Sequence, residues 1–342
     1  MLRLGLVLSV IAGSCISLYA TGAAASAEVN LYSARKEALI QPLLESFTSE
    51  TGIKVNLVTG KADALLKRLK SEGANSPADV LLTTDAGRLH RAKAADVTQA
   101  FNSELINSVV PEAYRDSDNH WVGLSVRSRP ILYVKGKVNP QDLSTYEDLA
   151  DAKWKKRICI RSSSNIYNQS LIASMIVANG KAKTETWAKG LVANMARPPK
   201  GGDRDQIKAA AAGQCDIAIA NTYYLAGMLN SKKDSEKNAA IKMGVFWPNQ
   251  SGRGAHVNIS GAALTRYSKN SANAIKLIEY LASEKSQQWY AETNGEYPVI
   301  SSVAVGNTLK AWGKFKPDSL HLGQLGELNS DAVMLMDRAG WK

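Results

Sequence analysis

The stretch Gly213–Tyr224, which reads GQCDIAIANTYY, runs from a buried strand directly into the start of a helix. Its apolar part predicts a strand over Asp216–Ala220, because a short apolar run between polar residues is typical of a strand inside a sheet. The pattern after it predicts a helix over Thr222–Leu229. Tyr223 and Tyr224 therefore follow the carboxyl end of a strand, which is the edge where open α/β sheets bind ligands.

The same arrangement occurs once earlier in the chain. A strand is predicted over Arg157–Arg161, followed by a helix over residues 165–178 with Tyr167 at its start. If the two strands are parallel neighbours, their carboxyl ends share one edge of the sheet. We therefore expect Tyr167 to lie beside Tyr223 and Tyr224.

Strands and helices alternate in the N-terminal part of the chain. The predicted strands are Val29–Tyr32, Ile53–Thr59 and Ala78–Thr84, and helices over Lys36–Ser49 and Asp63–Glu72 separate them. Such alternation indicates a mainly parallel sheet with helices on both faces. The sequence therefore predicts an α/β fold.

The middle of the chain indicates a second α/β lobe. Further strands are predicted over Trp121–Val126, Ile131–Val134 and Val257–Leu264, with no low-complexity linker between them. We expect two lobes joined by strands that cross near Val126–Val134 and Arg253–Leu264. A cleft between such lobes is the usual place for a ligand.

The composition excludes several classes of protein. The 342 residues include 42 Lys and Arg against 31 Asp and Glu, which gives a net charge of +11, and 45% are hydrophobic. These values exclude disordered chains, collagen, small disulfide-dense domains and polytopic membrane proteins. The basic residues are dispersed along the chain, which argues against a nucleic-acid-binding protein.

The N-terminus predicts export. Residues 1–27 have the features of a signal peptide, namely Arg3, an uncharged run over Leu4–Ala20, and an A-x-A cleavage site at Ala25–Ala27. The alternatives are an uncleaved membrane anchor and a lipoprotein at Cys15, whose lipobox is poor. No later stretch approaches 18 apolar residues, so we expect a mature monomer in the periplasm that does not span the membrane.

Two cysteines remain in the mature chain. Cys159 lies eight residues before Tyr167, and Cys215 lies eight before Tyr223. If the two strands are in register, the cysteines face each other at the roughly 5–6 Å between Cα atoms that a disulfide needs. In an exported chain this favours a Cys159–Cys215 disulfide, with two buried free thiols as the alternative.

Three converging tyrosines indicate a hard, highly charged cation. A phenol with its pKa near 10 is normally neutral, but Fe³⁺ prefers anionic oxygen and displaces the proton. Three phenolates would balance a charge of 3+. Ca²⁺ or Mg²⁺ would require carboxylates and zinc would require His and Cys, whereas the four histidines here have no ligand spacing. The alternative is that Tyr223 and Tyr224 only pack at a helix start.

Several motifs together resemble one known family, the ferric-iron-binding periplasmic proteins of bacterial ABC transporters. The blocks that carry the resemblance are Val29–Arg35, Ser76–Leu82, Tyr146–Ala150, Arg157–Ser163, Gly213–Tyr224 and Asn294–Val299. The resemblance implies the two-lobed type 2 periplasmic binding-protein fold, with mixed sheets flanked by helices. It also implies that Tyr167, Tyr223 and Tyr224 are the metal ligands.

The chain departs from one branch of this family on the side of the first lobe. Where some members have a His-Tyr pair, this sequence has Lys36 and Glu37. Glu37 is therefore a candidate extra ligand, with an exposed carboxylate at a helix start as the alternative. Another branch completes the metal shell with an anion such as carbonate. Arg35 and Arg127 are the candidates to hold it, since their forked donors suit a planar oxyanion.

The predicted function is that of the periplasmic solute-binding component of an iron ABC importer. It would bind Fe³⁺, with Fe²⁺ left open, and deliver it to an inner-membrane permease. The alternative is a type 2 binding protein for an oxyanion, a polyamine or a thiamine-like cation. An enzyme is not expected, because the sequence has no G-x-S-x-G or H-E-x-x-H motif. Asp203 and Asp205 lie in a polar turn and are predicted to be solvated.

The resemblance also predicts the boundaries of the parts. Residues 1–27 form the signal peptide. The first lobe comprises residues 28–128 and 254–304. The second lobe comprises residues 129–253 and 305–342 and carries the three tyrosines.

Overall fold

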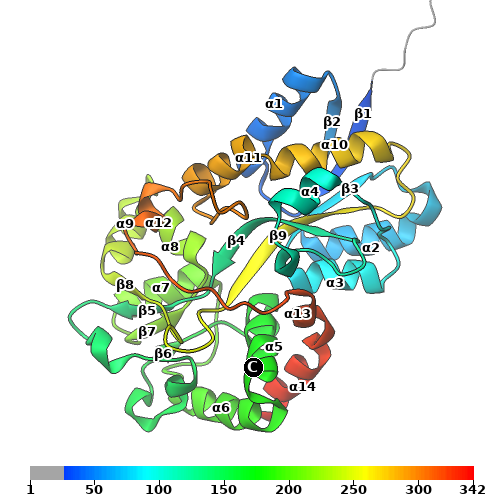
Figure 1. Ribbon diagram of the computed structural model, residues 1–342. Helices are drawn as coiled ribbons and strands as arrows, with labels where there is room; N and C mark the ends of the chain where they lie inside the picture. The colour runs from blue at the N-terminus through cyan, green and yellow to red at the C-terminus, as the bar shows by residue number, and fades with distance from the viewer. Residues whose placement is uncertain (1–26) are drawn as a thin grey trace, which may run out of the picture.

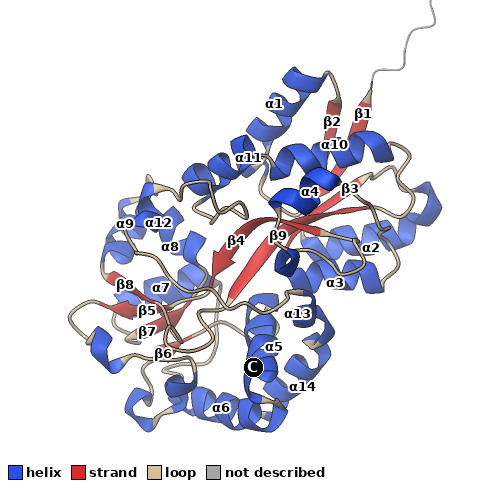
Figure 2. Cartoon of the chain, in the orientation of Figure 1, coloured by secondary structure: helices blue, strands red, loops and turns tan. Residues whose placement is uncertain are grey.

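The computed structural model describes residues 27–342, so the predicted signal peptide, apart from its last residue, lies outside the described residues. The structure contains two mixed sheets flanked by helices (Figure 1, Figure 2). This confirms the predicted fold class. The helices are α1 Gln41–Thr51, α2 Ala62–Glu72, α3 Ala86–Ala94, α4 Glu104–Val109, α5 Ile166–Asn179, α6 Lys181–Asn194, α7 Asp203–Ala211, α8 Thr222–Leu229, α9 Asp234–Ile241, α10 Ser271–Ala282, α11 Glu284–Trp289, α12 Asn307–Lys310, α13 Gly323–Glu327 and α14 Asn329–Arg338.

The first sheet has the strand order β2-β1-β3-β9-β4. Its strands are β1 Glu28–Ser33, β2 Lys54–Thr59, β3 Val80–Thr84, β4 Val122–Ser128 and β9 Val257–Leu264. Strand β1 is parallel to β2 and β3, as the βαβ pattern predicted. Strand β9 is antiparallel to both β3 and β4. Every residue of β4 and β9 is buried, which explains why both read as strands from sequence.

The second sheet has the order β6-β7-β5-β8. Its strands are β5 Ile131–Val134, β6 Ile158–Cys159, β7 Ile217–Ile219 and β8 Met243–Phe246. Strands β6 and β7 are parallel, as predicted, and β5 is antiparallel to β7 and β8. Strand β6 is only two residues long, so most of the strand predicted there is loop.

Two stretches of chain connect the sheets. The chain leaves the first sheet at the end of β4 and enters β5 after two residues, and it returns from β8 to β9 through residues 247–256 (Figure 1). The first crossing lies within the predicted Val126–Val134, whereas the second overlaps the predicted Arg253–Leu264 only over residues 253–256. Helix α13 packs against both α3 and α5, whereas the last helix, α14, packs against α5 and α6.

The helix predicted over Lys36–Ser49 begins later than expected. A short 3-10 helix occupies Glu37–Leu39, and α1 starts only at Gln41. Pro42 lies in the first turn of α1, where its missing N–H costs no hydrogen bond and its fixed φ favours a helix start. The proline therefore separates the two segments.

The predicted disulfide is present, but the reasoning about strand register was wrong. Cys159 and Cys215 are bonded, with Cα atoms 5.9 Å apart. In the ladder, however, Cys159 pairs with Ala218, so Cys215 lies in the loop before β7. The cause is a local irregularity: the amides of Asp216 and Ile217 both donate to the carbonyl of Arg157, at 2.8 and 3.0 Å. Although each cysteine lies eight residues before a tyrosine, the two cysteines are not paired with each other in the β6–β7 ladder.

We expect the disulfide to contribute substantially to stability. The double variant Cys159→Ala/Cys215→Ala should lower the free energy of unfolding by about 3–4 kcal/mol, because the bond closes a loop of 56 residues in the unfolded chain. Urea denaturation of the variant and the oxidised wild type measures this difference. Equal transition midpoints would contradict the expectation.

Candidate metal-binding site

The three predicted tyrosines lie in the first turns of two helices. Helix α5 follows β6, and the side chain of Asn165 caps it by accepting from the amide of Tyr167 at 3.1 Å. Helix α8 follows β7 directly, with Tyr223 and Tyr224 in its first turn. Since β6 and β7 are parallel neighbours, both helix N-termini lie at the same edge of the second sheet. Their free N–H groups favour negative charge at this edge.

The tyrosine side chains converge as predicted. The hydroxyl of Tyr223 donates to the hydroxyl of Tyr167 at 3.1 Å. The rings of Tyr223 and Tyr224 lie 4.4 Å apart between centroids, with an angle of 36° between their planes. All three side chains are partly exposed, so a small cation can reach them from solvent.

The protein keeps the phenols of Tyr223 and Tyr224 protonated when no cation is present. Burial raises the pKa of Tyr223 well above 10, and the neighbouring Tyr167 and Tyr224 raise it further. Burial likewise raises the pKa of Tyr224, with Tyr167 and Asp203 acting in the same direction. Arg127 opposes the shift at Tyr223 and Arg161 opposes it at Tyr224. Phenolates at Tyr223 and Tyr224 are therefore unfavourable here unless a cation binds beside them.

Sequence reasoning missed a buried ion network behind the tyrosines. Asp203, at the first position of α7, accepts from Nη1 of Arg129 and from Nη1 of Arg161, both at 2.7 Å. Arg129 also donates to Asn221 and Asn168, at 2.9 and 2.8 Å. The guanidinium of Arg161 lies 5.7 Å from the ring centroid of Tyr167.

The prediction that Asp203 is solvated was therefore wrong. Its side chain is fully buried, and two arginines compensate its charge. Asp205 is exposed, as predicted, and it caps α7 by accepting from the amide of Gly202 at 2.7 Å. The polar turn thus contains one buried and one exposed carboxylate. The local sequence does not show which of the two is buried.

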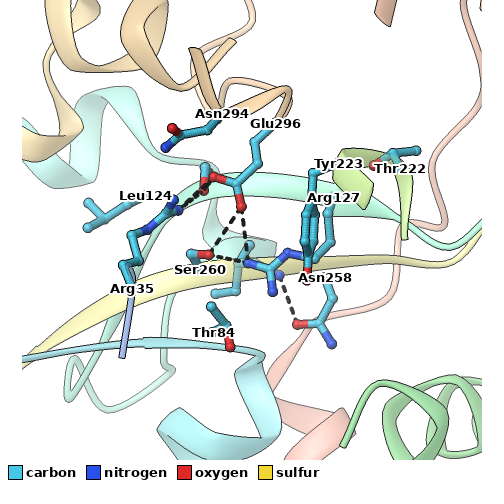
Figure 3. Close-up of polar contacts among 12 residues, drawn as sticks. Arg35, Thr84, Leu124, Arg127, Thr222, Tyr223, Asn258, Ser260, Asn294 and Glu296 are labelled. Carbon is cyan, nitrogen blue, oxygen red and sulfur yellow. Dashed lines mark hydrogen bonds and ion pairs between the residues drawn. The ribbon is translucent and has the colours of Figure 1, made fainter. Parts of the chain in front are cut away.

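The two arginine candidates occupy different environments (Figure 3). Arg35 follows β1, and its Nη2 donates to Glu296 at 2.7 Å and to Ser125 at 2.8 Å. Arg127 lies on β4, with its guanidinium carbon 5.7 Å from the ring centroid of Tyr223. Arg127 also lines a narrow pocket together with Tyr167, Asp85, Ser128, Arg129, Asn221, His256 and Asn258. Arg127 therefore contacts the ring of Tyr223 and lines a pocket with Tyr167, whereas Arg35 pairs with Glu296 and interacts with Tyr223 through its charge.

The side chain of Glu37 is exposed. Glu37 is the first residue of the 3-10 helix Glu37–Leu39, and its side chain makes no hydrogen bond within residues 27–342. The preceding Lys36 is exposed as well. A role for Glu37 as a metal ligand stays a prediction.

Other kinds of metal site are not found in the described part of the chain. Between residues 27 and 342, no three His, Cys, Asp or Glu side chains gather closely enough to hold a metal ion. In the same range, no helix has the length and apolar character needed to cross a membrane.

Known proteins with similar sequence and structure cover nearly the whole chain. Residues 75–318 match the family of bacterial extracellular solute-binding proteins. Iron uptake protein A1 of Synechocystis is 50% identical over 92% of this chain and 88% of that protein. The major ferric iron-binding protein of Neisseria meningitidis is 29% identical over 93% and 94%, respectively.

Solved structures agree with these relatives. The Trichodesmium protein IdiA, or FutA, in complex with iron and citrate ligands superimposes with a TM-score of 0.90 at 53% identity, over 92% of this chain and all of that one. The apo ferric ion-binding protein A of Pasteurella haemolytica superimposes with a TM-score of 0.85 at 43% identity, over 92% and 98%. The chain belongs to the bacterial extracellular solute-binding proteins.

Proposed function

We propose that the chain is the periplasmic binding component of an iron ABC importer, and not an enzyme. The observation that carries this proposal is the convergence of Tyr167, Tyr223 and Tyr224 at two adjacent helix N-termini. The relatives support it, because they include an iron uptake protein, a ferric iron-binding protein and a structure with iron and citrate. The cargo is Fe³⁺, and the recipient is an inner-membrane permease.

The binding step replaces three protons with one cation. Each phenol loses its proton as its oxygen bonds to iron, and three phenolates balance the charge of Fe³⁺. The two helix N-termini, Arg127 beside Tyr223 and Arg161 beside Tyr224 stabilise the phenolates, whereas the carboxylate of Asp203 opposes them. An oxyanion such as carbonate or citrate completes the shell on the side of Arg127. The lobes then close around the cargo by a hinge motion at the two crossing stretches.

The direct test of this function is colour. Adding ferric citrate to the apo protein should produce a visible absorption band, because phenolate-to-iron charge transfer absorbs in the visible range. A colourless wild type that does not retain iron would reject the proposal. Calorimetry with phosphate and with spermidine then shows whether the site takes an oxyanion or a polyamine instead.

Iron binding should release protons and should weaken in acid. Because the pKa values of Tyr223 and Tyr224 are raised, both phenols are protonated at neutral pH, and protons compete with the metal more strongly as the pH falls. Calorimetry in two buffers with different ionisation enthalpies counts the protons released. Tyr224→Phe should release one proton fewer per iron than the wild type. An equal count would show that Tyr224 does not bind as a phenolate.

A further inference from the structure

A buried carboxylate lies between the two arginines that were predicted to hold an anion. Glu296 is 4% exposed, and its Oε2 accepts from Nη2 of Arg35 at 2.7 Å and from Oγ of Ser125 at 3.0 Å. Its Oε1 accepts from Oγ of Ser260 at 3.4 Å and lies 3.8 Å from Nη2 of Arg127 (Figure 3). Within residues 27–342, this single carboxylate is the acidic partner of both arginines.

The backbone fixes the position of this carboxylate. The next residue, Tyr297, exchanges two hydrogen bonds with Val126 on β4, from N to O and from O to N, both at 2.7 Å. Val126 is the neighbour of Arg127 and lies where β4 approaches the second sheet. Glu296 is therefore held in place by the same strand that carries Arg127.

The two arginines use their donors differently. Arg35 directs its Nη2 to Glu296 and Ser125, and its guanidinium faces the ring of Tyr290 at 5.0 Å from the centroid. Arg127 directs its Nη2 to Ser260. Its Nε and Nη1 are buried and have no hydrogen-bond partner within residues 27–342, and the Nε of Arg35 has none either, so Nη1 is the donor that distinguishes Arg127. Unpartnered buried donors are costly, so their presence next to the tyrosines points to a ligand.

We propose that Glu296 is a positioning residue that gives the two arginines different roles. It pairs with Arg35, and through Ser260 it orients Arg127, which lines the pocket beside Tyr167 and keeps its Nη1 without a protein partner within residues 27–342. The cluster of two arginines and one carboxylate keeps one unit of positive charge, which is the charge available to an oxyanion that accompanies the metal. This inference rests on the proposed function for the role of the anion, and it assigns the anion to Arg127 and not to Arg35.

The test changes the charge of the cluster and keeps its shape. Glu296→Gln raises the net charge from one positive unit to two, and Arg35→Gln/Glu296→Gln restores one unit. The matched control is Asp318→Asn, which removes a carboxylate from the Arg253–Asp318 ion pair, where the N–O distance is 3.0 Å. Each variant is titrated with sodium bicarbonate and, separately, with citrate. The readouts are the melting temperature of the apo protein and the visible band of the ferric form.

Glu296→Gln should lower the melting temperature and also lower the anion concentration for half-saturation by roughly tenfold, because an added charge attracts the anion across a few ångströms. The double variant should return to the wild-type half-saturation, and adding Arg127→Gln to it should abolish the response to anions. The control should change the melting temperature only. The arms with bicarbonate and citrate identify which anion fits.

Three results would overturn the inference. One is an unchanged half-saturation in Glu296→Gln, which would make the residue purely structural. Another is loss of the anion response in the double variant, which would assign the anion to Arg35. The third is a wild type whose melting temperature and visible band respond to neither anion. If the wild type gives no ferric band, the proposed function fails, whereas the titration of the apo protein still decides the role of Glu296.

Discussion

The double variant Tyr223→Phe/Tyr224→Phe should lose the visible ferric band and should not retain iron against citrate. Each substitution deletes one of the oxygens proposed to bind the metal and leaves the ring in place, so the 4.4 Å packing of the two rings persists. The loss of affinity should far exceed the roughly 10- to 100-fold effect of removing an outer-shell partner. Absorption spectroscopy and iron retention after dialysis against citrate measure both effects.

The fold of this variant should remain intact. Within residues 27–342, the hydrogen bonds of these two hydroxyls stay among the three tyrosines: Tyr223 donates to Tyr167, and Tyr223 and Tyr224 are hydrogen-bonded to each other. The control is Tyr133→Phe on β5, which removes a phenol from the same sheet at a distance from the site and should keep the band. A band of undiminished intensity in the double variant would show that these tyrosines do not bind the metal.

Local sequence patterns predicted the elements that carry the tyrosines. Strand β7 and helix α8 lie where the apolar run and the pattern after it indicated, and α5 begins one residue from its predicted start. These elements are recognisable because a strand or helix with a buried face repeats its apolar residues at a fixed period. The convergence of Tyr167 with Tyr223 was predicted from the same register that proved wrong for the cysteines, and it holds because parallel neighbouring strands end at a common edge.

The ion pairs around the site were not predictable in the same way. Arg129 and Asp203 are 74 residues apart, and Arg35 and Glu296 are 261 residues apart. A single charged side chain has no period, so nothing in the local sequence shows whether it will be paired in the interior. The disulfide was predicted correctly from cysteine count and context, whereas the register argument failed because β6 is short and the chain is irregular at Asp216.

Asp203→Asn should strongly destabilise the fold. The substitution leaves Arg129, which is 1% exposed, without its counter-charge, and an uncompensated buried charge costs about 3–5 kcal/mol. The melting temperature should fall by roughly 6–20 °C. Thermal and urea denaturation of the apo protein measure the loss. The matched control is Asp205→Asn on the same helix, whose side chain is exposed and whose loss should cost about 1 kcal/mol as a weakened cap.

Asp203→Asn should also make Tyr223 and Tyr224 easier to ionise. The carboxylate of Asp203 raises the pKa of both Tyr223 and Tyr224, so its removal should lower both pKa values. Ultraviolet titration of the apo variant and the wild type should then show two phenols that ionise at lower pH. If Asp203→Asn and Asp205→Asn were equally stable, the stabilising role of the buried ion network would be contradicted. If the phenol titration were unchanged, Asp203 would have no electrostatic effect on Tyr223 and Tyr224. If both effects appear, Asp203 has two roles. It stabilises the fold through its ion pairs with Arg129 and Arg161, and it keeps Tyr223 and Tyr224 protonated until the metal binds.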